Sequence, residues 1–269
     1  MELFDALKFE IKKGWKSMLI FGGVIGLLFL VLVAMYDPAI FEHYNEIIES
    51  LPPELLGLLG GQVDLGTFSG YFNMYTLEFA WMWFGLYLIL KVAQDIPGEM
   101  ENKTIDLVLS KPIKRWEYVL SKQLHHIITI FVAVTIPLGL SLAAIGFNTK
   151  ILNTNVNFGG ILLSYLWLTI LLWAIESTVL LISTVFRRRS ATAIGFAVIM
   201  VLWFIPAFSG SIPIDNIEYI SIFQYFNTRV ILIDELMTNV VRDILILVGW
   251  SVVMSVCAII YFMKRDIPV

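Results

Sequence analysis

Six apolar stretches, each long enough to form a helix that crosses a lipid bilayer, constrain the fold of this chain more than any other feature. A spanning helix needs about 20 mostly apolar residues, and it satisfies its own backbone hydrogen bonds. The predicted spans are residues 18–35, 71–93, 124–147, 158–186, 191–208 and 244–263. We therefore expect an all-α, polytopic membrane protein with one transmembrane domain over residues 1–269.

Composition agrees with this prediction. The chain is 58% hydrophobic and 15% charged, whereas soluble domains carry about 25% charged residues. The positions of the basic residues predict the orientation. Of the 18 lysines and arginines, all but Lys150, Arg229 and Arg242 lie at the predicted ends of spans that share one side. Because cytoplasmic segments carry the excess of Lys and Arg, both termini are expected to be cytoplasmic, in the cell membrane.

Shorter helices are expected at both membrane surfaces. Apolar residues at helical spacing, with lysines beside them, predict an amphipathic interfacial helix over residues 1–17, which we expect to be retained and not cleaved as a signal. The acidic external connection is expected to hold short helices at 41–50 and 54–61. Residues 217–233 are too polar to span and too apolar for a free loop, so they predict one or two short interfacial or re-entrant helices.

The sequence contains no phosphate-binding loop, no zinc-protease motif and no nucleophile elbow. We expect no enzyme activity in this chain and no bound cofactor, metal or nucleic acid. Cys257 is the only cysteine, which excludes an intramolecular disulfide. His125 and His126 are adjacent, so on a helix they point about 100° apart. We interpret them as interfacial residues at the end of a span.

The polar segment 99–117 separates the second and third spans. We expect a short helix that begins near Asn102 to Thr104 and stops at Pro112, because the residue before a proline avoids the helical region. A short helix held between two membrane-spanning helices suits docking to a soluble partner. A charged loop that only sets the topology has the same composition, so the residues alone leave both interpretations open.

This polar segment resembles the signature of ABC-2 type transporter permeases. The matching pattern is Glu99-x4-Thr104-Ile-Asp-Leu-Val-Leu-Ser-Lys-Pro-Ile-Lys-Arg115-x6-Lys122. Residues 51–56, 219–227 and 262–267 are similar to other, weaker features of that family. The chain departs from the pattern at Lys103, where glycine is usual, and at Ile222, where a proline often follows the serine.

The resemblance implies a six-span permease of an ATP-driven exporter, with a separate ATPase subunit that binds ATP and Mg. It also implies a second permease copy, most simply a homodimer, surrounded by membrane lipids. Residues 104–115 would form the coupling helix against the ATPase. The residues expected at this interface are Glu99, Thr104, Leu107, Leu109, Ser110, Pro112 and Arg115.

Glu78 and Glu176 are the exceptional ionisable residues within the predicted spans. A carboxylate in a bilayer costs a few kcal/mol unless it faces other helices or finds a donor. One hypothesis is that they line a substrate path. The other is that each makes a structural hydrogen bond with a neighbouring helix.

Two further functions compete with the exporter. One is a membrane scaffold whose polar segment docks a cytoplasmic protein. The other is a secondary transporter that uses Glu78 and Glu176 for proton coupling.

Overall fold

The computed structural model describes residues 3–41, 52, 55, 65–105, 113–234 and 236–265. These residues form helices and the turns that connect them, and they contain no strand. The described part of the chain has six helical runs long and apolar enough to cross a membrane, one at each predicted span. They are α1 (Leu3–Ala34); α4, η1 and α5 together (Phe68–Glu101); α7 (Arg115–Phe147); α9 (Phe158–Val185); α10 (Arg188–Phe208); and α12 (Val240–Lys264).

The second run contains a change of helix type. It starts as α4 (Phe68–Phe72), continues as the π-helix η1 (Asn73–Glu78) and ends as α5 (Ala80–Glu101). Thr67 caps its first turn, because the Thr67 side chain accepts a hydrogen bond from the Gly70 amide at 3.2 Å. Short π-helical segments inside α-helices are frequent at functional sites.

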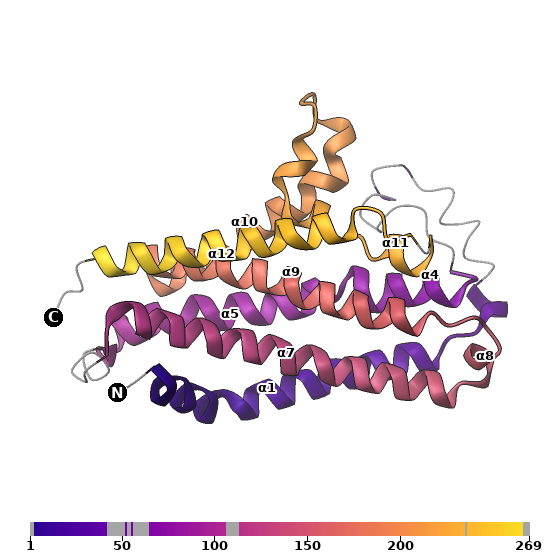
Figure 1. Cartoon of the computed structure of the whole chain (residues 1–269), viewed down its shortest axis with the longest axis horizontal. Helices are drawn as coiled ribbons and strands as arrows, with labels where there is room; N and C mark the ends of the chain where they lie inside the picture. The colour runs from indigo at the N-terminus through magenta and orange to yellow at the C-terminus, as the bar shows by residue number, and fades with distance from the viewer. Residues whose placement is uncertain are drawn as a thin grey trace.

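Helices α1, α5, α7, α9 and α12 lie roughly side by side, and both chain termini lie at the same end of the bundle (Figure 1). We call this the terminal end. The short helices α4, α8 (Thr149–Leu152) and α11 (Arg229–Leu232) lie at the opposite end. Helix α7 packs against α1, α9 and α12, while α9 also contacts α5, α10 and α12. Helix α9 carries apolar residues around its whole circumference, which is typical of a helix at the centre of a bundle. Four of its side chains between Trp167 and Leu172 are fully or almost fully buried.

Two glycines bring α1 close to α7. Gly22 and Gly26 are four residues apart, the spacing at which small residues let membrane helices approach. A Cβ atom at Gly22 would lie 3.1 Å from the Cα atom of Ala133, and one at Gly26 would lie 2.7 Å from Cδ1 of Leu140. The close contact between these helices therefore depends on the absence of side chains at both positions.

The N-terminal region differs from the prediction. Residues 1–17 were expected to form a separate interfacial helix, but α1 is one continuous helix from Leu3 to Ala34. The side of its first turns that faces the protein carries Ala6 and Glu10, whereas Phe4 and Phe9 are exposed. Glu10 faces the protein because it pairs with the buried Lys122, described below, and the apolar spacing did not show this orientation.

The predicted external helices are described only in part. Residues 41–50 and 54–61 lie outside the described residues, apart from Phe41 and Leu55. Residues 217–233 form three short helical elements, which agrees with the expected short helices. They are η3 (Ile217–Ile220), η4 (Ile222–Tyr225) and α11. The Ser221 hydroxyl donates a 2.5 Å hydrogen bond to the carbonyl of Leu202, which fixes these turns to α10.

Candidate functional site

Six ionisable side chains meet near the terminal end, where α1, α5, α7 and α9 pack together. We call them the buried charge cluster. Helix α7 supplies the two basic residues, and the other three helices supply the carboxyl groups. The members are Glu10, Asp95, Glu99, Lys122, His126 and Glu176.

Lys122 is the centre of one half of the cluster. Its side chain is fully buried, and its ammonium group donates to Glu10 at 2.8 Å and to Glu99 at 2.5 Å. The Tyr118 hydroxyl donates to the second carboxylate oxygen of Glu99 at 2.6 Å. These contacts connect α1, α5 and α7.

His126 is the centre of the other half. Its Nε2 atom lies 2.8 Å from a carboxylate oxygen of Asp95, and its Nδ1 atom lies 2.9 Å from Oε1 of Glu176. The His126 and Glu176 side chains are fully buried. Because a neutral imidazole has one N–H donor, the two contacts together require one additional proton, on the ring or on a carboxyl group.

Burying the ionisable groups of this cluster costs electrostatic free energy. Among the described residues, two basic side chains face four carboxyl groups, and Lys13 lies 3.6 Å from Glu99 at its margin. Ionisable groups inside a membrane bundle are tolerated when they pair with one another. Breaking such a pair leaves an uncompensated buried charge, which is strongly destabilising. The arrangement can therefore hold four helices in a defined register.

Metal binding and access to the surface are two further properties of the buried charge cluster. Among the described residues, no group of three His, Cys, Asp or Glu side chains is placed to hold a metal ion. A cleft of about 580 Å³ opens beside the Lys122 half, lined by side chains of α1, α5, α7 and α10. Glu10, Asp95, Glu99 and Tyr118 all reach its wall, so the cluster has access to the terminal end.

Arginine side chains connect the ends of several helices at the terminal end. Arg115 donates to the carbonyl of Arg265 at 2.8 Å, and Arg265 in turn donates to the carbonyl of Thr184. Arg188 donates to Gln94 at 2.8 Å. The first turns of α7 and α10 are therefore tied to the last turns of α12 and α5.

Helix α5 ends in a Schellman motif. The Thr104 amide donates to the carbonyl of Glu99 at 3.0 Å, and the Lys103 amide donates to the carbonyl of Met100 at 3.2 Å. Lys103 has a φ of 55°, in the left-handed region that favours glycine. The sequence prediction put a helix start near Asn102 to Thr104. Asn102 and Lys103 follow the end of α5, and Ile105 is again helical. The family's usual glycine at position 103 thus matches a backbone requirement that this chain meets with a lysine.

The residues expected at the ATPase interface are described in part. Leu107, Leu109, Ser110 and Pro112 lie outside the described residues. Thr104 and Arg115 lie at the two ends of that gap, and Thr104 is exposed. Glu99 hydrogen-bonds to Lys122 and Tyr118, and it also lines the cleft described above.

The two predicted intramembrane carboxylates do not meet. Glu176 belongs to the buried charge cluster, and it contacts His126, a partner type that the sequence interpretation did not name. Glu78 lies in η1 and lines a separate pocket of about 150 Å³ with Trp81 and other residues. Asp95, which shares His126 with Glu176, follows Glu78 by 17 residues, or about 25 Å along a helix.

The interpretation of the two histidines was wrong. Both are buried, with exposed fractions of 2% for His125 and 0% for His126. The sequence carries a signal that could have shown this: Tyr118, Lys122 and His126 are spaced by four residues and therefore share one face of α7. Asp95 and Glu99 have the same spacing on α5. Complementary charges at matching intervals indicate two helix faces that pair.

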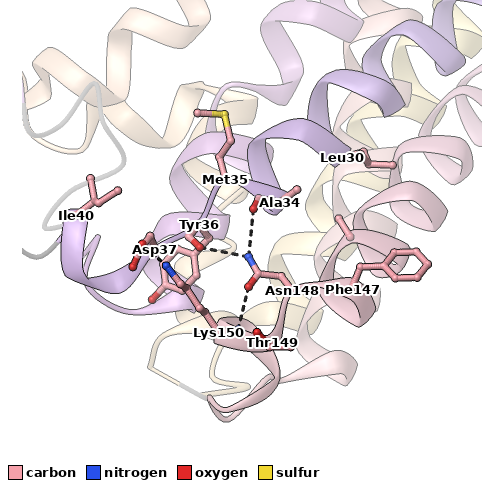
Figure 2. A pocket seen from close by; sticks show the side chains of 11 residues that line it. Leu30, Ala34, Met35, Tyr36, Asp37, Ile40, Phe147, Asn148, Thr149 and Lys150 are labelled. Carbon is pink, nitrogen blue, oxygen red and sulfur yellow. Dashed lines mark hydrogen bonds and ion pairs between the residues drawn. The ribbon is translucent and has the colours of Figure 1, made fainter.

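A second pocket, of about 440 Å³, lies at the opposite end between the last turns of α1 and α7 (Figure 2). The Asn148 amide donates to the carbonyls of Ala34 and Tyr36, both at 3.2 Å, and its oxygen accepts from the Lys150 amide. Lys150 also forms an ion pair with Asp37, and this hydrogen bond lowers the pKa of the Asp37 carboxyl. These contacts join α1 to α8 and give the pocket a structural role.

Comparison with known proteins identifies the family. The family described as ABC-2 family transporter protein matches residues 11–267, which is nearly the whole chain. No curated protein matches the chain.

Proposed function

Because this chain belongs to the ABC-2 transporter family, we propose that it is the membrane subunit of an ATP-driven exporter. It is a multi-pass membrane component that lacks an ATPase domain, and ABC permeases generally pair with nucleotide-binding subunits. The energy for transport then comes from ATP and Mg bound by the partner. Cargo moves outward across the cell membrane, and the terminal end of the bundle faces the cytoplasm.

The proposed ATPase contact is the docking segment, which we define as residues 102–114, between α5 and α7. One observation carries this proposal: the two helices that flank the segment are clamped together just inside the bundle. Glu99 lies three residues before the segment, and Lys122 lies eight residues after it, with their charged atoms 2.5 Å apart. A force on the segment therefore reaches α5 and α7 together.

The buried charge cluster extends this connection through the bundle. Lys122 links α7 to Glu10 of α1, and His126 links α7 to Glu176 of α9. A partner can shift the permease only if it contacts one conformation better than another. We propose that α5 and α7 move as one unit with the ATPase, and that the carboxylates on α1 and α9 set the positions between which this unit moves.

The outer faces of α10 and α12 suit contact with lipid or with a second permease copy. Large apolar side chains are exposed along both helices. They include Phe196, Val201, Val241, Leu245, Val252, Val253, Val256 and Ile260. We propose a homodimer in which one part of this apolar surface packs against the second copy and lipid covers the rest.

The proton-coupled alternative has less support. That hypothesis used Glu78 and Glu176 together, but Glu176 is engaged by His126 and Glu78 lines a different pocket. The scaffold alternative would use the same docking segment without transport.

Co-expression with the paired nucleotide-binding subunit tests the proposal. Replacing residues 104–110 with a Gly-Ser segment of equal length should abolish co-purification of the ATPase and the ATP hydrolysis of the complex. The matched control replaces residues 212–215, in the connection after α10, with a Gly-Ser segment of their own length. This control should leave co-purification of the ATPase and ATP hydrolysis intact. Retained binding after the first replacement would contradict the assigned contact. If the unaltered chain binds the ATPase but the complex shows no ATP-dependent transport in vesicles, the scaffold function is favoured.

A further inference from the structure

A separate pocket lies between α1 and α5, next to the buried charge cluster. It has a volume of about 340 Å³, and we call it the α1–α5 pocket. Its wall includes basic and hydroxyl-bearing side chains from three helices. The residues used below are Lys13, Gly14, Ser17, Tyr87, Lys91 and His125.

Two nitrogen atoms of residues in this wall are buried without a hydrogen bond, although the Lys91 ammonium also lies 5.8 Å from the centroid of the Tyr87 ring. Among the described residues, the Lys91 ammonium and the His125 Nδ1 atom have no hydrogen-bond partner, and the His125 side chain is 2% exposed. Glu10 and Asp95 also line the pocket, but they hydrogen-bond to Lys122 and His126. A buried polar group without a hydrogen bond costs free energy. The Lys91 ammonium can only donate, so it indicates a missing acceptor, and the His125 Nδ1 atom can donate to the same acceptor when it carries the proton.

A glycine provides the room in which these groups sit. A Cβ atom at Gly14 would lie 2.7 Å from the Cε1 and Nε2 atoms of His125 and 3.3 Å from the Lys91 nitrogen. A side chain at this position would push the imidazole away and fill the space beside the ammonium. The absence of a side chain at Gly14 therefore keeps open the space beside the Lys91 ammonium and the His125 imidazole.

The pocket has a closed inner boundary and a lipid-facing flank. The hydroxyl groups of Ser17 and Tyr87 lie 3.1 Å apart, and the Tyr87 ring stacks on Phe21 with ring centroids separated by 4.1 Å. These contacts close the gap between α1 and α5 on one side. On the surface nearby, Trp15 and Leu90 are more than two-fifths exposed, and this apolar surface suits acyl chains.

We propose that the α1–α5 pocket binds a phosphate group, and that an anionic phospholipid headgroup supplies it. Phosphate oxygens are strong acceptors for an ammonium group and for an imidazole N–H. Basic pockets between membrane helices on the cytoplasmic side bind anionic headgroups for this reason. Lys91 and His125 contact the phosphate, Lys13 approaches it from the rim, and the acyl chains lie along Trp15 and Leu90. This inference rests on the proposed cytoplasmic orientation of the terminal end, but not on the ATPase contact or on the cargo.

Thermal unfolding of the purified full-length chain in detergent tests the site. The melting midpoint is measured while phosphatidylglycerol, phosphatidylcholine or inorganic phosphate is titrated. Phosphatidylglycerol should raise the midpoint saturably, and Lys91→Met should weaken its apparent affinity by at least about fivefold, the effect of one lysine at an anionic membrane surface. Lys16→Met is the matched control, because Lys16 is exposed on α1 and does not line the pocket. It should change the affinity by less than twofold.

The other outcomes are equally informative. Equal weakening by Lys16→Met and Lys91→Met would overturn the proposal, since it would show general surface attraction. Equal protection by phosphatidylcholine would also overturn it. Saturable protection by inorganic phosphate that Lys91→Met removes would support a phosphate site filled from solution.

A second measurement does not depend on the folding of a variant. A photoreactive phosphatidylglycerol added to the unaltered chain should crosslink to peptides that contain residues 13–17 or 87–91, and excess unlabelled phosphatidylglycerol should compete. Crosslinks confined to other helices would overturn the assignment. Lys91→Arg, which keeps the charge, should retain the crosslink.

Discussion

Lys103 occupies a backbone conformation that costs an L-amino acid roughly 1–2 kcal/mol relative to glycine. We predict that Lys103→Gly stabilises the chain by about 1 kcal/mol, because glycine meets the requirement of the Schellman motif without strain. The measurement is the melting midpoint of the purified protein in detergent. Lys103→Ala removes the same charge but keeps the Cβ atom, so it should give no gain. A gain with alanine as large as that with glycine would show that charge, and not φ, is the cause.

Lys122 is fully buried between two carboxylates. Lys122→Met should destabilise the protein by about 3–5 kcal/mol, because Glu10 and Glu99 lose the buried ammonium group that they share. Adding Glu99→Gln to this variant should recover part of the loss. The midpoints of the single and double variants measure this coupling, and strict additivity would contradict it. Lys150→Met, at an exposed ion pair, is the control and should cost less.

At the scale of elements, the glycines of α1 provide a direct test of how α1 packs on α7. Gly22→Leu should separate the two helices and destabilise the protein by about 1–3 kcal/mol, because the added atoms meet the backbone of Ala133. Gly23→Leu is the matched control, since a Cβ atom there has no described neighbour within 4 Å. The comparison of the two melting midpoints checks the prediction. Equal effects would indicate that loss of glycine flexibility, and not the contact, is responsible.

The helices also show which features the sequence predicted and which it did not. Hydropathy predicted each long helix, because a span must be apolar over its own length. It did not predict that α1 would be continuous or that Glu10 would face inward, since those features depend on Lys122, more than 100 residues away. A helix was predicted to begin near Asn102 to Thr104. Ile105, the residue that follows, is helical, and residues 106–112 lie outside the described part of the chain.

At the scale of the whole molecule, the two chain ends share one end of the bundle (Figure 1). We predict that this end is cytoplasmic. In a Cys257→Ala background, Lys150→Cys should react in intact cells with a maleimide that cannot cross the membrane. Lys8→Cys should react only after permeabilisation, and it serves as the opposite-side control. Labelling of Lys8→Cys in intact cells would reverse the orientation and remove the docking segment from the reach of an ATPase.

The sequence by itself determined the membrane class, the six helices and the family, because apolar length and a short local motif are properties of contiguous residues. It also singled out Glu99, Lys122 and Glu176. Only the tertiary structure decided that these residues join Glu10, Asp95 and His126 in one buried charge cluster. The physical reason is that an ionisable group inside a membrane bundle is stable only beside its partner, and the partners here lie on different helices. Which faces of α1, α5, α7 and α9 meet is a property of packing that no single segment encodes.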